Sequence, residues 1–151
     1  MFLQNLRAKV GARLNGDSEA GFTLIELLVV MLILGILAAI AIPAFFNQKE
    51  KGTDAQAKEA AHSAQVAAET FSTENGGSYT GINEDELKRI EPTLADAKDL
   101  TVATTASNQY TVTIESDTGT DFSIERSGAL TSFDCAPEKT GGCPNGGDWA
   151  K

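Results

Sequence analysis

The hydrophobic residues of this chain are concentrated in one segment near the N-terminus. From Leu27 to Phe46, about 20 consecutive residues carry neither a charge nor a strongly polar side chain. As an α-helix this segment is about 30 Å long, which matches the hydrocarbon core of a bilayer. A helix in the core of a soluble domain usually keeps one polar face, and this segment has none. The pattern therefore predicts a membrane-inserted helix.

A second helical pattern follows between Thr53 and Asn75, where the sequence contains neither Gly nor Pro. Small apolar residues and one aromatic recur at helical spacing on one face: Ala57, Ala60, Ala61, Ala64, Ala67, Ala68 and Phe71. Polar residues are expected on the other face: Lys58, His62, Gln65, Glu69 and Ser72. Asn75-Gly76-Gly77 is a typical helix stop. We expect one long helix with an apolar first half and an amphipathic second half, on which His62 is solvated.

In the C-terminal half of the chain the apolar residues recur at every second position. Apolar and polar residues alternate in four segments, which predicts four strands: 100–104, 110–115, 122–126 and 129–133. Asp117-Thr118-Gly119-Thr120 predicts a hairpin turn. Between the long helix and the first strand, Asn83 followed by three acidic residues predicts a short capped helix that runs to about Ile90 and stops near Pro92.

These elements predict an α+β fold. One face of the antiparallel sheet collects the large apolar side chains: Tyr110, Val112, Ile114, Phe122 and Ile124. The alanine face of the long helix is the surface that this sheet would cover. The predicted fold is therefore a long N-terminal α-helix packed on a small antiparallel β-sheet.

Charge and composition reduce the number of function classes that fit this chain. The chain has 12 Lys and Arg against 21 Asp and Glu, a formal net charge of −9, which argues against a nucleic-acid partner. One His and two Cys cannot complete a four-ligand zinc site of these residue types, and they leave little for His-based catalysis. We expect no enzyme, no cofactor and no metal. The basic residues Arg7, Lys9 and Arg13 precede the apolar segment, which favours a cytosolic N-terminus.

The apolar segment has three interpretations. The first is a secretory signal that is cut near Ala41, because Ala39 and Ala41 are the small residues of a signal cleavage site. The second is a plain membrane anchor. The third is a helix that stays in the mature protein after a cut that follows Gly21. The first two give no use to Glu26, an acid placed at a cost in an apolar segment. A cut after Gly21 would give Phe22 a free ammonium. Between staggered neighbouring chains, that ammonium and Glu26 would form a pair that sets register.

The segment Gly21-Phe22-Thr23-Leu24-Ile25-Glu26 and the apolar run after it resemble the N-terminal signature of type IV pilins and pseudopilins. The resemblance implies that a prepilin peptidase cuts between Gly21 and Phe22 and N-methylates Phe22, and that Glu26 acts in assembly. It also implies helix-loosening roles for Gly35 and Pro43. The chain would then comprise a leader (1–21), a transmembrane or filament-core helix (22–46), the amphipathic half of that helix (47–75) and a globular head (76–151).

The tail of the head contains both cysteines, Cys135 and Cys143. Outside the cytosol a disulfide is expected, worth about 2–3 kcal/mol for so short a loop, and two free thiols are the alternative. Pilins often close a C-terminal loop in this way. Asp134, Asn145 and Asp148 offer oxygen ligands of the kind that calcium prefers, as some pseudopilin heads do, although solvated acids are the commoner explanation.

The resemblance implies a structural function. The chain is expected to be a subunit of a type IV pilus, a helical homo-oligomer, whose partners are the prepilin peptidase, the assembly platform in the membrane and, before assembly, membrane lipid. It would be a single-pass protein of the cytoplasmic or inner membrane and then part of an extracellular pilus. Two alternatives stay open: a pseudopilin of a type II secretion or DNA-uptake machine, and a secreted globular domain with an ordinary signal cut near Ala41.

Overall fold

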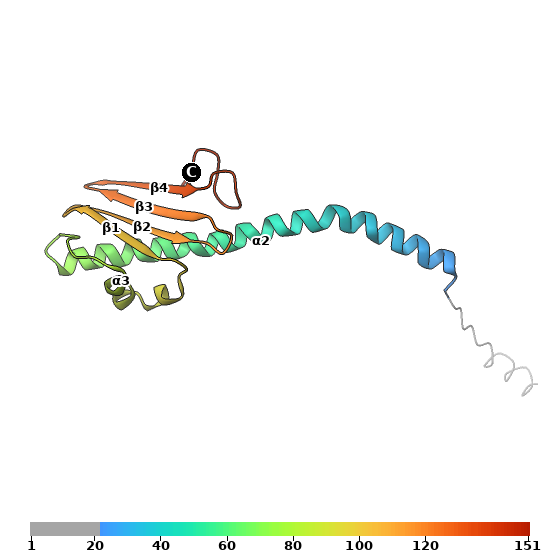
Figure 1. Ribbon diagram of the computed structural model, residues 1–151, viewed down its shortest axis with the longest axis horizontal. Coiled ribbons are helices and arrows are strands. Elements are labelled where there is room, and N and C mark those ends of the chain that lie inside the picture. The colour runs from blue at the N-terminus through green and yellow to red at the C-terminus, as the bar shows by residue number, and fades with distance from the viewer. Residues whose placement is uncertain (1–21) are drawn as a thin grey trace, which may run out of the picture. The chain divides into compact units, whose positions relative to one another are not determined.

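The computed structural model describes residues 22–151, so the leader and Gly21 lie outside the described residues. The described chain forms the helices α2 (Leu24–Glu74) and α3 (Glu84–Ile90), the 3₁₀ helix η1 (Pro92–Asp96) and four strands (Figure 1). It divides into two compact units between Ala41 and Ile42. We call the unit that comprises Ile42–Lys151 the globular unit.

The described part of the N-terminal unit, residues 22–41, contains the first part of α2, and its surface is largely apolar. All but one of residues 22–41 are exposed, including side chains as large as Leu32 and Ile40. α2 is the one helix in the described part of the chain that is long and apolar enough to cross a membrane, and none of its most apolar window is buried. The predicted apolar helix is therefore present, and residues 22–151 do not bury it.

The sheet is an antiparallel meander of four strands in the order β1-β2-β3-β4. Its strands are β1 (Thr101–Ala106), β2 (Gln109–Glu115), β3 (Asp121–Ser127) and β4 (Leu130–Ala136). The four strands expected from the alternating pattern are thus confirmed, and each is one to three residues longer at an end than predicted. The register of β2 with β3 and of β3 with β4 is regular, whereas the pairing of β1 with β2 shifts between Ala103 and Ala106.

The core lies between one face of this sheet and the alanine face of α2. Burial alternates along β2, so that Tyr110, Val112 and Ile114 face inward, and Phe122 and Ile124 of β3 join them. From α2 the core receives Ala61, Ala64, Ala67 and Ala68, all with no exposed surface. Small side chains let the helix approach the sheet closely, and each large apolar side chain buried there stabilises the fold by about 1.5–3 kcal/mol. The predicted α+β packing is confirmed.

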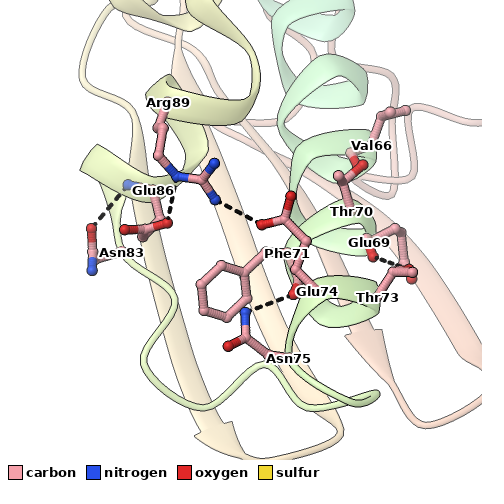
Figure 2. Close-up of polar contacts among 10 residues, drawn as sticks. All are labelled: Val66, Glu69, Thr70, Phe71, Thr73, Glu74, Asn75, Asn83, Glu86 and Arg89. Carbon is pink, nitrogen blue, oxygen red and sulfur yellow. Dashed lines mark hydrogen bonds and ion pairs between the residues drawn. The ribbon is translucent and has the colours of Figure 1, made fainter.

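A short helical segment joins the end of α2 to the sheet. The amide of Glu86 donates to Asn83 Oδ1 at 3.1 Å, which makes Asn83 the predicted N-cap of α3. Arg89 of α3 then donates to Glu86 at 2.9 Å and to Glu74, at the end of α2, at 2.8 Å (Figure 2). Both ion pairs are exposed, so they orient α3 more than they stabilise it.

The short helix α3 ends at Ile90, just before Pro92, as predicted. Pro92 then opens the 3₁₀ helix η1, which was not predicted, and a proline at the first helical position loses no hydrogen bond. Contrary to expectation, the polar face of α2 is not uniformly solvated, since Ser72 is buried and Glu69 and Lys58 contact the rest of the globular unit. The sheet and the C-terminal loop extend past the alanine stripe and cover its polar flanks. His62 is exposed as expected, and its ring lies 5.1 Å from that of Trp149.

Candidate functional site

The first turn of α2 is closed by a capping box. The amide of Glu26 donates to Thr23 Oγ1 at 3.2 Å, and the amide and hydroxyl of Thr23 donate back to Glu26 Oε2 at 3.3 and 3.2 Å. These bonds satisfy two of the amides that a helix start leaves unpaired, and the helix dipole favours an acid at this position. Sequence reasoning missed this role of Glu26, although the spacing of Thr23 and Glu26 is the signal for it.

The capping box leaves part of the Glu26 carboxylate available. Only Oε2 accepts hydrogen bonds from residues 22–151, and Oε1 has no partner among them. Glu26 is exposed, and the neighbouring Phe22 is 86% exposed. The carboxylate can therefore accept a further donor without giving up its capping bonds.

Gly35 and Pro43 both lie inside α2, which is helical on either side of each. A side chain built at Gly35 would meet no atom within 4 Å, so packing within this chain does not require a glycine there. Pro43 has no amide to donate to the carbonyl of Ala39, so the helix lacks one bond at that point. Both residues lie in the apolar stretch of α2.

A buried acid near the start of the globular unit was not anticipated. Asp54 has no exposed surface, and its carboxylate accepts hydrogen bonds from Thr118 Oγ1 and from the amide of Gly142, both at 2.6 Å. One turn further along α2, Lys58 Nζ donates to the carbonyl of Gly142 at 2.7 Å. The sequence signals were an acid one turn before the alanine stripe and two adjacent glycines, Gly141 and Gly142, which sequence reasoning assigned to the disulfide loop alone.

A second polar cluster lies further along α2. Glu69 accepts hydrogen bonds from the hydroxyls of Tyr79 and Tyr110, at 2.8 and 3.0 Å, and from Arg126 at 3.0 Å. Burial, followed by the hydrogen bond to this carboxylate, raises the pKa of Tyr110 above its ordinary value, and the same two causes raise the pKa of Tyr79. The cluster holds the helix to β2 and β3 and has no nucleophile or general base at a binding cleft.

Cys135 and Cys143 form a disulfide, which agrees with the expectation from the sequence. Two of the residues offered for calcium have other partners. Asp134 and Asp148 pair through their backbones, and the Asp148 carboxylate lies 2.9 Å from Lys151, whose hydrogen bond lowers the pKa of Asp148. In residues 22–151 no three His, Cys, Asp or Glu side chains are arranged to hold a metal ion.

Comparisons with known proteins bear on the N-terminal segment. Residues 17–42 match a family described as the prokaryotic N-terminal methylation motif. The chain is also 44% identical over 54 residues to the type IV major pilin protein PilA of Myxococcus xanthus. That alignment covers 36% of the chain and 24% of the Myxococcus protein, so the chain matches about a quarter of this relative's length. No solved structure matches the chain significantly.

Proposed function

We propose that this chain, whose residues 17–42 match the prokaryotic N-terminal methylation motif, is a structural subunit of a type IV pilus. It is cut between Gly21 and Phe22 by a prepilin peptidase, N-methylated on Phe22, and polymerised through its apolar helix. The observation that carries the proposal is the surface of residues 27–46, which is apolar around the helix and is not buried by any of residues 22–151.

This surface needs an apolar environment at every stage. A soluble monomer rarely exposes a continuous apolar patch of more than a few hundred square ångströms. Before assembly, lipid covers the helix, because about 20 apolar residues span a bilayer. In a filament, the same helices from neighbouring subunits cover one another. The 22–46 segment thus acts as membrane anchor first and as filament core afterwards, and residues 47–151 carry the exposed head.

Glu26 has a specific part in this scheme. In the uncut chain its Oε2 caps its own helix through Thr23, and Oε1 is open. After the cut, the ammonium of Phe22 on a neighbouring subunit supplies a cation for that oxygen. An unpaired carboxylate in an apolar bundle costs several kcal/mol, so only the alignment that pairs it is stable. The pair therefore selects one axial register between subunits.

The proposed location and partners follow from this sequence of events. Arg7, Lys9 and Arg13 keep the leader in the cytosol, where the peptidase acts, and the head emerges on the opposite side of the cytoplasmic or inner membrane. The partners are the peptidase, the assembly platform and other copies of the same chain in an extracellular filament. Acidic heads, which carry nearly all the net charge, give the filament a soluble exterior.

Two experiments test the proposal. Mass spectrometry of the mature protein should find a chain that begins at methylated Phe22, whereas a chain that begins at Ile42 would remove the filament helix and refute the proposal. Electron microscopy of cells that express Glu26→Ala should find processed subunits and no fibres. Glu50→Ala, an exposed acid on the same helix beyond the apolar segment, is the control and should assemble normally.

The second experiment also separates the proposed pilus from a pseudopilus. Long surface fibres from the wild-type chain at native expression identify a pilus, while short or absent fibres, with loss of secretion on deletion, identify the pseudopilin alternative. Normal fibres from Glu26→Ala would refute the pairing of Glu26 with the Phe22 terminus.

A further inference from the structure

We propose that Asp54 and Lys58 of α2 and the loop closed by Cys135–Cys143 form an oxidation-dependent lock. When the disulfide closes, the loop presents the peptide of Gly142 to both helix side chains, and their hold on that peptide in turn favours the closed disulfide. The lock attaches the C-terminal loop to the helix just beyond the apolar segment. It is independent of the proposed filament function.

The first half of the lock is the buried carboxylate of Asp54. It has no exposed surface, and its two oxygens accept one bond each from the hydroxyl of Thr118 and the amide of Gly142. A buried carboxylate is strongly unfavourable without such donors. Since Thr118 lies in the β2–β3 turn and Gly142 in the disulfide loop, the position of that loop determines whether the carboxylate keeps both partners.

The second half is Lys58, one helical turn after Asp54. Its ammonium donates to the carbonyl of Gly142 at 2.7 Å and lies over the rings of Phe122 and Trp149, 5.2 and 5.7 Å from their centroids. Asp54 therefore holds the amide of Gly142 and Lys58 holds its carbonyl. Two charged side chains thus engage both polar groups of one residue.

The glycines of the loop are fitted to this contact. A side chain on Gly141 would overlap the Asp54 carboxylate, and Gly141 has a φ of 51°, in the left-handed region. A Cβ on Gly142 would lie 3.0 Å from the Cβ of Asp54, closer than such atoms normally approach. Glycine at position 141 lets the backbone reach the carboxylate, and a larger residue at position 142 would require Asp54 to shift.

The disulfide fixes the position of this backbone because Cys143 directly follows Gly142 and Cys135 is anchored in β4. When it forms, the two thiols pass two electrons to an external disulfide oxidant and lose two protons. One S–S bond forms in the chain, and the S–S bond of the oxidant breaks to give two thiols. The coupling between the two events is reciprocal. If closing the disulfide strengthens the hydrogen bonds of Asp54 and Lys58 to Gly142, those hydrogen bonds must favour disulfide formation by the same free energy.

The test measures the equilibrium constant for disulfide formation in the full chain, purified in detergent micelles. The protein is equilibrated with glutathione buffers of known ratio, and the oxidised fraction is read by thiol alkylation and mass spectrometry. Asp54→Ala and Lys58→Met should each lower the constant about tenfold, the effect of losing one charge-assisted hydrogen bond. Glu59→Gln changes an exposed neighbour on α2 whose side chain makes no hydrogen bond within residues 22–151, and it should match wild type.

The outcome decides the proposal even where one variant folds poorly. Lys58→Met keeps an unbranched side chain of similar length and removes the ammonium, so it decides the question alone if Asp54→Ala does not fold. Constants for Asp54→Ala and Lys58→Met within twofold of Glu59→Gln would overturn the lock. That result would leave the filament proposal intact, because fibre assembly is tested at Glu26.

Discussion

Replacing Glu69 with alanine is expected to lower the free energy of unfolding of the globular unit by about 2–4 kcal/mol. The carboxylate accepts three hydrogen bonds, and the substitution removes all of them. Tyr110 is 1% exposed, so its hydroxyl cannot turn to water instead, and an orphaned buried hydroxyl costs about 1–3 kcal/mol. The pair with Arg126 adds about 0–1 kcal/mol, because both side chains are about one-third exposed, at 32% and 36%.

Two matched variants isolate this cause. Glu69→Gln keeps an acceptor oxygen and the shape of the side chain, so it should cost about 1–2 kcal/mol, less than Glu69→Ala. Tyr110→Phe removes the hydroxyl that Glu69→Ala would orphan. The double variant Glu69→Ala/Tyr110→Phe should therefore be more stable than the sum of the two single effects predicts, by at least about 1 kcal/mol.

The assay is urea unfolding of the full chain in mild detergent, followed by the fluorescence of Trp149, the one tryptophan in the sequence and a buried residue. Its ring belongs to the core of the globular unit, so the signal reports that unit and not the apolar helix. The reasoning is refuted if Glu69→Ala unfolds within about 0.5 kcal/mol of wild type, or if the single effects are additive.

Four further predictions can be tested by the same unfolding assay. Burial raises the pKa of Tyr110, so above about pH 10 the unfolded chain loses the hydroxyl proton before the folded chain does, and the free energy of unfolding falls. Tyr110→Phe should therefore lose less stability than wild type between about pH 8 and pH 11, and an equal loss would contradict the pKa shift. Phe122→Ala should cost about 3–5 kcal/mol, whereas Leu130→Ser, at an exposed site, should stay within about 0.5 kcal/mol of wild type. Ala64→Leu should destabilise by about 1–3 kcal/mol, since the contact between helix and sheet has no room for the larger side chain, and a neutral result would mean that the contact is loose. Asn83→Ala should cost about 0.5–2 kcal/mol by removing the cap of α3, and Asn83→Asp, which restores the acceptor, should recover most of it.

The elements whose residues repeat regularly could be predicted from the sequence. The alanine spacing from Ala57 to Phe71 and the alternation in β2 and β3 are local patterns, and each determines which face of its element is buried. Within the globular unit, the alanine face of α2 and one face of the sheet are the two apolar faces, so they pack against each other. The α+β arrangement follows from that without knowledge of any long-range contact.

The polar contacts could not be predicted in the same way. Asp54 is buried by a turn and a loop that lie 64 and 88 residues away in the chain, and no local pattern encodes that meeting. Glu69 was assigned to the solvated face because helical periodicity describes the helix alone, whereas the partners of Glu69 come from the sheet. The 3₁₀ helix η1 was not predicted, because a proline that ends one helix and a proline that begins another look alike in sequence.

Asp54 and Glu69 attach the helix at two separate points, about 15 residues or roughly 22 Å apart along its axis. With a single point of attachment, the sheet could rotate about that point relative to the helix. Two points, at opposite ends of the alanine stripe, remove that rotation. Force applied along α2 is therefore met by the sheet as one rigid body, and deformation would begin with the release of one of these two carboxylates.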